Sequence, residues 1–396
     1  MVERVRAGVS QRAVAREFGV SLATVQLWLA RAGESPLDRV DWSDRPSVRK
    51  RTSRTPAEVE DRIVAVRREL RLWSPFGEHG PAAIARELSA QGVDGIPVER
   101  TIARILERRG ALDGRHRIRR PSPPPGWYLP DVREREAELD AFDVVEDIVL
   151  VGGIRVDILT GISLHGSESS AWPKSGIDGA FVAASLAERW VGIGLPAYAQ
   201  FDNDPRFAGS HGHPNAIGIV VRFCLGLGVT PVFAPPREMG VQAAIEAFNG
   251  RWQRGVRRDF IADIDHLGER SAAYVVADRA RRAGRIDAAP SRRTLPTPLR
   301  VDLGAEVRGR LVFVRRVADD GSVLLLGTRY PVDPTWVHRL VRADLDIDVR
   351  RLRMFGLRRR EPLNQPLLAE HAFSYPPTWE QRPGRAVISI DRDPVE

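Results

Sequence analysis

The stretch that decides the fold runs from Tyr198 to Asn249. It opens with Tyr198-Ala-Gln-Phe-Asp202-Asn203-Asp204-Pro-Arg-Phe and closes with Ala234-Pro-Pro-Arg-Glu-Met-Gly240-Val-Gln-Ala-Ala-Ile-Glu246-Ala-Phe-Asn249. The apolar run before Asp202 predicts a short strand that ends at an acid, and the Pro/Gly loop before Glu246 predicts entry into an amphipathic helix. A scaffold of sheet and helix can bring two such acids together, and a pair of carboxylates could hold a divalent metal ion.

The residues around this stretch alternate between strand and helix patterns. Two strands at 144–151 and 154–162, joined at Gly152-Gly153, predict a hairpin. A helix at 178–191, a strand at 197–201, a helix at 215–227, a strand at 229–234 and a helix at 241–260 follow. Strands first and alternating helices and strands later favour a mixed α/β sheet with helices on its faces.

The charge of the chain points to a polyanionic partner. The formal net charge is +8, and lysine occurs only at Lys50 and Lys174, so nearly all the basic residues are arginines. Arginine binds phosphate through two parallel hydrogen bonds, which favours nucleic acid over a small neutral ligand. The single cysteine, Cys224, excludes a disulfide framework and a cysteine-rich zinc module, so no zinc is expected.

No stretch has the apolar length of a membrane span, and the first residues lack the apolar segment of a signal peptide. We therefore expect a soluble intracellular protein without a membrane partner, in the cytoplasm of a prokaryotic cell and associated with its DNA.

Residues 1–33 predict a helix-turn-helix DNA-binding domain. Gly19 suits the tight turn, Ser21 is a good N-cap, and apolar residues recur at helical spacing on both sides. In such a domain the second helix enters a major groove. The residues expected at base edges are Leu22, Ala23 and Gln26, and those expected at phosphates are Arg12, Arg16 and Arg31. The alternative is an ordinary pair of antiparallel helices.

Residues 34–54 predict a basic linker, and residues 55–114 a second helix-turn-helix-like DNA-binding domain. Thr55-Pro-Ala-Glu58 forms a capping box, and two later helical segments at 80–88 and 98–106 enclose a loop. Arg100 and Arg104 on the last segment are candidates for DNA contact. Two tandem modules would read a longer DNA site than one.

The remaining boundaries follow from composition. We expect a Pro/Arg-rich linker at 115–135, a catalytic core at 136–286, a second linker at 287–299, a small SH3-like β-barrel at 300–360 and an irregular Pro-rich tail at 361–396.

The core from Asp143 to Asn249 resembles the integrase catalytic core of retroviral integrases and bacterial insertion-sequence transposases. That family has an RNase H-like fold with an Asp, Asp, Glu metal triad. Asp202-Asn203 is similar to its second motif, Glu246 in Ile-Glu-Ala-Phe-Asn249 to its third, and Asp143 in Phe-Asp-Val-Val-Glu-Asp to its first. Helix-turn-helix elements before the core and a β-barrel after it also fit the family.

The resemblance implies a polynucleotidyl transferase that nicks DNA at the ends of a mobile element and joins them to a target. Asp143, Asp202 and Glu246 would hold two Mg²⁺ ions about 4 Å apart, with Mn²⁺ as a possible substitute. The partners would be double-stranded DNA, at the element ends and at the target, and further copies of the chain in a homo-multimer. Asn249, Arg254 and Arg257 on the long helix would face the DNA.

Several assignments stay open at this level. Asp140, Asp147 and Asp157 compete with Asp143 for the first position, and Glu238 competes with Glu246. The sequence departs from the family pattern at Asp204, where a glycine is usual, at Ser163 and His165 after the second strand, and in a longer loop that contains His211 and His213. Two other functions remain: a non-catalytic DNA-binding regulator derived from a transposase, and a structure-specific nuclease of the same fold.

Overall fold

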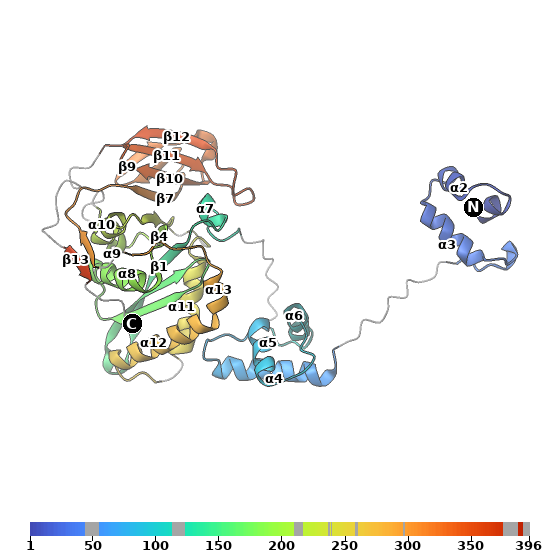
Figure 1. Ribbon diagram of the computed structural model, residues 1–396, viewed down its shortest axis with the longest axis horizontal. Coiled ribbons are helices and arrows are strands. Elements are labelled where there is room, and N and C mark those ends of the chain that lie inside the picture. The colour runs from blue at the N-terminus through green and yellow to red at the C-terminus, as the bar shows by residue number, and fades with distance from the viewer. Residues whose placement is uncertain are drawn as a thin grey trace. The chain divides into compact units, whose positions relative to one another are not determined.

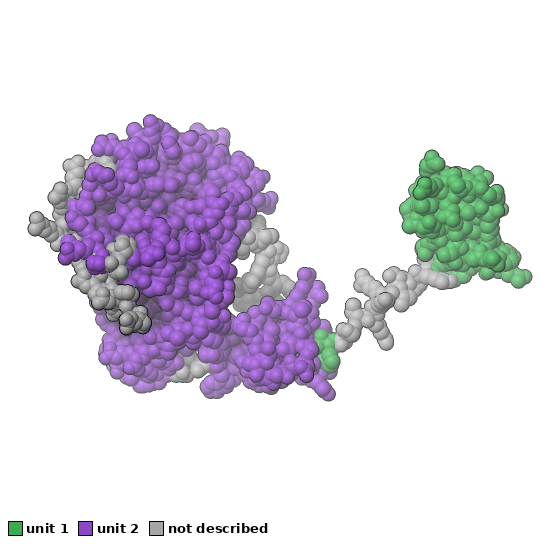
Figure 2. Space-filling view, in the orientation of Figure 1, with its two compact units in different colours: residues 1–56 green, residues 57–396 purple. Residues whose placement is uncertain are grey.

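A computed structural model describes residues 1–43, 55–112, 123–209, 217–236, 238, 240–257, 260–295, 298–374 and 387–390. The chain divides into two compact units, Met1–Pro56 and Ala57–Glu396 (Figure 2). Within the described ranges, no helix is both long and apolar enough to cross a membrane.

The first unit is a small helical bundle. Its helices are α1 (Val2–Arg6), α2 (Gln11–Glu17), α3 (Leu22–Ala32) and the 3₁₀ turn η1 (Leu37–Arg39). Ser21 caps α3 by accepting a hydrogen bond from the Thr24 backbone N–H at 3.1 Å, and Gly19 adopts a φ of 62° in the turn before it. Val14 and Val25 are fully buried where α2 meets α3. The structure therefore has a helical region where the sequence predicts one.

The second unit begins with three more helices, α4 (Ala57–Trp73), α5 (Pro81–Ala90) and α6 (Glu99–Arg108). They enclose a small core of their own around Ile63, Ile84 and Ile102. The loop between α4 and α5 packs on later helices so closely that a Cβ on Gly77 would lie 2.5 Å from the Arg254 Cβ. This helical module therefore belongs to the same compact unit as the sheet that follows, although the sequence suggests a separate domain at 55–114.

A nine-stranded mixed sheet forms the centre of the second unit (Figure 1). Its order is β12-β11-β10-β7-β5-β4-β1-β2-β3. The strands on the core side are β1 (Leu139–Val149), β2 (Arg155–Ser163), β3 (Ser169–Lys174), β4 (Tyr198–Phe201) and β5 (Thr230–Phe233), with the 3₁₀ turn η2 (Val151–Gly153) between β1 and β2. The β1–β2 hairpin is confirmed as antiparallel, β4 and β5 join β1 as parallel strands, and β3 is a strand that the sequence analysis missed.

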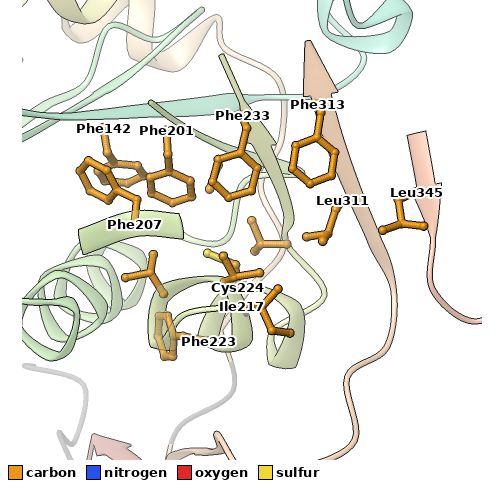
Figure 3. Close-up of a cluster of buried hydrophobic side chains, with 14 of the residues drawn as sticks. Phe142, Phe201, Phe207, Ile217, Phe223, Cys224, Phe233, Leu311, Phe313 and Leu345 are labelled. Carbon is orange, nitrogen blue, oxygen red and sulfur yellow. The ribbon is translucent and has the colours of Figure 1, made fainter. Parts of the chain in front are cut away.

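Helices cover both faces of this sheet because its strands alternate side chains between two cores. Phe142, Phe201, Phe233 and Phe313 point to one face from four strands, where they form a row (Figure 3). The helices on that face are α8 (Gly179–Ile193) and α10 (Ile219–Gly226), with the short α9 (Pro205–Ala208) beside them. The opposite face is covered by α11 (Ala243–Val256) and α12 (Ile264–Arg281), and α13 (Ala283–Asp287) follows.

The C-terminal strands extend the sheet of the core. They are β6 (Leu299–Asp302), β7 (Arg310–Arg316), β8 (Ser322–Leu325), β9 (Thr328–Pro331), β10 (Leu340–Asp346), β11 (Arg351–Gly356), β12 (Leu367–Ala372) and β13 (Val387–Ile390), with the 3₁₀ turn η3 (Pro334–Trp336). β7 pairs in parallel with β5, while β8 and β9 form a separate two-stranded sheet. The sequence predicts a small β-barrel at 300–360, and four of the strands in this region and after it, β7, β10, β11 and β12, belong to the sheet of the core.

Three stretches expected to be linkers or a tail contain residues held by burial or by strand pairing. Trp127, Tyr128 and Leu129, placed in the predicted 115–135 linker, are buried in the core just before α7 (Pro130–Arg133). Arg293, in the predicted 287–299 linker, makes a β-bridge with Leu195. The predicted tail contains β12, which pairs with β11, and β13, which pairs with β6. Aromatic side chains and strand pairing outweigh the proline content of these segments.

Candidate active site

Asp143 and Asp202 lie side by side at the centre of the sheet. β1 and β4 are parallel neighbours, and Ala141 stands opposite Gln200. Continuing that register by two residues brings Asp143 beside Asp202, directly after the end of β4. Both side chains are half-buried. The pairing of β1 with β4 thus places two carboxylates side by side on the core sheet.

Glu246 reaches this edge from α11. Its helix is held on the sheet by the buried Ile245, Phe248 and Trp252, and Gln200 on β4 donates a hydrogen bond to the Val241 carbonyl, just before the helix, at 3.2 Å. The Glu246 side chain is exposed, as a group that binds a solvated ligand needs to be. Glu246 is near enough to Asp143 for its charge to raise the pKa of Asp143.

The charges of the neighbouring acids act on the Asp143 carboxylate. Burial and then the negative charge of Asp202, with a smaller contribution from Glu246, raise the pKa of Asp143 to about 6. Hydrogen bonds from the Val144 backbone N–H at 2.9 Å and from Asn249 Nδ2 at 2.8 Å act in the opposite direction. Like charges held together in this way favour either a proton or a cation between them.

The loop after β4 fixes Asp202. Burial raises the pKa of Asp202, while a hydrogen bond of 2.9 Å from the Asp204 backbone N–H lowers it. Asp204, where the family has glycine, has a φ of −62°, caps α9 through the Arg206 N–H and forms an ion pair with the Arg206 side chain at 2.6 Å. The position therefore needs no glycine here, and the Asp204 carboxylate is engaged by its own loop.

Asp140 has a different surrounding from Asp143. Its carboxylate is fully buried and accepts hydrogen bonds from Arg189 Nε at 3.0 Å, from Arg292 at 2.6 Å and from the Trp190 indole at 3.1 Å. Burial alone would raise its pKa, but the two guanidinium groups outweigh burial and hold the pKa well below the usual range. Ser163 belongs to the same network, since both arginines donate to its hydroxyl. Asp140 is therefore a buried ion-pair partner of Arg189 and Arg292.

The other competing acids are engaged elsewhere. Asp147 forms an exposed ion pair with Arg155 at 2.8 Å, and the Asp157 carboxylate accepts a hydrogen bond from the Asp147 backbone N–H. Glu238 forms ion pairs with Arg316 and Arg359. His165 is buried, with its Nε2 at 2.7 Å from the Val132 carbonyl. His211 and His213 lie outside the described residues.

Arg315 is a residue that the sequence analysis missed. It comes from β7 and is half-buried. It donates hydrogen bonds to the carbonyls of Phe233 and Ala234 at 3.2 Å and to Asn203 Oδ1 at 2.7 Å. Asn203 in turn donates to the Ala234 carbonyl at 2.8 Å. Burial lowers the Arg315 pKa to about 10. A C-terminal strand thus fastens the loop of Asp202 to the end of β5. No motif signals it, because the contact depends on the pairing of β7 with β5.

Replacing Arg315 by Met is expected to loosen the Asp202 loop without removing a metal ligand. Groups that orient metal ligands change metal affinity by roughly 10–100-fold. The Mg²⁺ concentration for half-maximal strand joining should rise by about that factor, while the affinity for end DNA stays the same. Arg316→Met, on the neighbouring exposed residue, is the matched control. Equal effects of the two substitutions on the Mg²⁺ requirement would contradict a positioning role for Arg315.

The donor set suits a hard cation, although a formed metal site is absent. Across the described ranges, no three His, Cys, Asp or Glu side chains group closely enough to hold a metal ion. The pair Asp143 and Asp202 nevertheless supplies the oxygen ligands that Mg²⁺ prefers. The neighbouring Asn249 Oδ1 is buried and has no hydrogen-bond partner among the described residues. A cation with its water would satisfy both the paired charges and this orphaned oxygen.

Solved integrases show a weak likeness to this chain. The HTLV-2 integrase catalytic core domain in complex with magnesium (dimeric form) has a TM-score of 0.27 and 12% identity, over 35% of this chain and 82% of that chain. The BIV integrase catalytic core domain has a TM-score of 0.27 and 15% identity, over 35% and 81%. A simian T-cell lymphotropic virus intasome in complex with the PP2A regulatory subunit B56 gamma has a TM-score of 0.30 and 17% identity, over 50% and 66%.

These TM-scores are too low to carry an argument. No protein-family model matches the chain, and no curated protein was found to match it. The function proposed below therefore depends on the carboxylates and the sheet of this chain.

The residues expected to contact DNA differ in exposure. Those with exposed side chains are Arg12, Arg16, Ala23, Gln26, Arg100, Arg104, Arg254 and Arg257. Leu22 and Arg31 are half-buried, and the Arg31 guanidinium lies over the Trp28 ring at 4.9 Å. Asn249 is a correction, because it is buried and donates its hydrogen bond to Asp143. It holds an acid in place and is not available to DNA.

Proposed function

We propose that this chain is a DNA transposase or integrase that nicks DNA strands at the ends of a mobile element and transfers them to a target. The observation that carries the proposal is the parallel pairing of β1 with β4, which brings Asp143 beside Asp202. Glu246 on α11 is near enough for its charge to act on Asp143. The sequence resemblance implies the same three positions: a central strand, the end of its neighbour and a nearby helix.

In this proposal the three acids would hold Mg²⁺, which would supply charge stabilisation for the attacking and leaving oxygens of an in-line phosphoryl transfer. Asn249 fixes one oxygen of Asp143 at 2.8 Å. The Asp204 backbone N–H and Arg315, through Asn203, fix the loop of Asp202. Because these partners are already in place, the acids keep their orientation while water attacks in nicking and a 3′-hydroxyl attacks in joining. No covalent intermediate with the protein is needed.

The helical regions would bind the element ends. Ser10 and Ser21 cap α2 and α3, and the exposed Ala23 and Gln26 suit a helix that enters a major groove as the second helix of a helix-turn-helix. The module of α4, α5 and α6, with the exposed Arg100 and Arg104, would act as a second DNA-binding element. The active assembly would be a multimer on DNA, as the resemblance implies.

Incubation of the purified chain with labelled end DNA, a target plasmid and Mg²⁺ tests the proposal. A transposase or integrase gives nicked ends and joined products, both dependent on the metal. A nuclease of the same fold gives nicks and never joined products. A non-catalytic regulator binds the ends equally well with and without Mg²⁺ and gives neither product, which would contradict the proposed activity.

A further inference from the structure

A cavity of about 980 Å³ lies between the helical module and the catalytic helix α11. The loop between α4 and α5, together with α5 and α6, forms one wall, and α11 and α12 form the other. Glu246 is among its lining residues, so the cavity shares one acid with the candidate active site. Its volume is at the upper end of the roughly 300–1,000 Å³ of drug-sized ligand sites. It is much larger than a single phosphate ion needs.

The wall of this cavity is strongly basic. Seven arginines and three glutamates line it, so its formal charge is positive. Four of the arginines come from the sheet-bearing part of the unit: Arg251, Arg254, Arg281 and Arg282. The others come from the helical module: Arg67, Arg86 and Arg100. Arginines from two parts of the fold thus converge on one space, an arrangement that suits several phosphate groups better than one carboxylate.

Three arginines that line the cavity, Arg251, Arg281 and Arg282, share two carboxylates, Glu78 and Asp278. Arg251 is largely buried, and burial together with the charge of Arg282 lowers its pKa. The buried Nε atoms of Arg251 and Arg281 have no hydrogen-bond partner among the described residues. Asp278, on the other side, shares its carboxylate between Arg281 and Arg282. Desolvated guanidinium groups with unused donors favour an incoming anion.

One carboxylate now occupies the position where such an anion would bind. Glu78 accepts hydrogen bonds from Arg281 and, at 2.7 Å, from Arg86, and it lies 3.8 Å from Arg251 and 3.9 Å from Arg282. Burial would raise the Glu78 pKa, but these arginines lower it, so it stays ionised. A single carboxylate in contact with four arginines imitates a phosphate group.

We propose that this cavity binds backbone phosphates of the DNA strand that leads to the active site, and that Glu78 takes their place when no DNA is bound. The inference rests on the proposed function, since it takes DNA as the substrate. DNA is favoured over free phosphate because the cavity has room for more than one phosphate and extends to Glu246. A strand seated on Arg251 would pass from the helical module along α11 towards Asp143 and Asp202.

Binding of a fluorescein-labelled duplex to the full chain without divalent cations tests this cavity apart from catalysis. Arg251→Gln should weaken binding by about tenfold. It should also reduce the slope of log affinity against log salt by about 0.9, the value for one phosphate contact. Glu78→Gln should strengthen binding at least about threefold, because it removes a competing negative charge. Opposite effects of two neighbours in one ion-pair cluster are not expected from a purely structural role.

Two further variants keep the test decisive. If thermal unfolding shows that Arg251→Gln fails to fold, Arg86→Gln replaces it, because the Arg86 side chain is half-exposed. Arg86→Gln should reduce the slope of log affinity against log salt by a similar amount. Arg308→Gln removes an exposed arginine paired with Glu306, away from the cavity, and should leave the slope unchanged. The proposal is overturned if both Glu78→Gln and Arg251→Gln lose DNA binding, or if neither changes it. It is also overturned if Arg308→Gln has an effect equal to that of Arg251→Gln.

Inorganic phosphate at matched ionic strength distinguishes the source of the anion. Phosphate could protect the chain against thermal unfolding in a way that depends on Arg251, while Arg251→Gln leaves the salt dependence of duplex binding unchanged. That result would assign the cavity to a free anion and overturn the assignment to DNA. The outcomes are also separable from those of the proposed function. A chain that binds DNA through Arg251 but never joins ends contradicts the activity alone. A chain that joins ends with an unchanged salt dependence in Arg251→Gln contradicts the cavity alone.

Discussion

Asp202→Asn is expected to lower strand nicking and joining by roughly 10³–10⁴-fold, the scale seen when a member of a catalytic group is removed. The side chain keeps its shape, and its remaining carbonyl oxygen can still accept the hydrogen bond from the Asp204 N–H. What disappears is one negative charge beside Asp143, and with it the attraction for the cation that the reaction needs. Binding of end DNA, measured in the same preparation, should stay unchanged.

Asp147→Asn is the matched control for this prediction. It removes the same charge from the same region of the sheet, but Asp147 is exposed and paired with Arg155 at 2.8 Å. Joining by Asp147→Asn should stay close to that of the unmodified chain. If purified Asp202→Asn joined labelled ends as well as this control, Asp202 would not belong to the site.

The sequence suggests candidate acids more directly than it suggests how distant strands pair. Asp202 could be named as a candidate because few structural roles explain an acid directly after a buried strand and before Asn-Asp-Pro. The first acid stayed open between Asp140 and Asp143, since residues three apart on a strand point to opposite faces. Only the arginines that surround Asp140, from α8 and from the segment after α13, decide between them.

Contacts that depend on long-range pairing were beyond sequence reasoning. Arg315 reaches Asn203 because β7 pairs with β5, and that parallel pairing of distant strands has no local signal. The docking of Glu78 on Arg281 joins positions that are far apart in the chain in the same way. The stretch at Trp127 looked like a linker because prolines precede it, whereas three successive large apolar side chains make it part of the core.

Asp140→Asn and Asp143→Asn are expected to change the stability of the fold in opposite directions. The first leaves Arg189 and Arg292 without their buried carboxylate, and breaking a buried ion pair costs about 3–5 kcal/mol. The second removes a carboxylate whose pKa is raised to about 6 by burial, Asp202 and Glu246. Ionisation of Asp143 in the metal-free fold therefore opposes folding, and Asn should stabilise it at neutral pH by up to about 3 kcal/mol.

The pH dependence of stability follows from the direction of each pKa shift. The folded chain binds the proton of Asp143 more tightly than the unfolded chain does. The contribution of Asp143 to the free energy of unfolding therefore falls as pH rises from about 4 to about 6. Asp143→Asn should remove that fall. The Asp140 pKa is lowered, so its contribution is present at neutral pH and is lost as the pH drops below about 4. Urea unfolding midpoints of the three proteins, measured across this range without metal, separate the two effects.

The effect of Mg²⁺ on stability tests whether Asp143 or Asp140 is the first acid of the site. A cation that binds between Asp143 and Asp202 in the folded chain stabilises it by mass action. The unmodified chain should therefore gain stability with Mg²⁺, and Asp143→Asn should gain much less. Asp140→Asn, although weakened, should keep most of the gain, because its carboxylate faces arginines and not the site. The reverse pattern, with Asp143→Asn destabilised and Asp140→Asn insensitive to Mg²⁺, would make Asp140 the first acid and place the site on the other face of β1.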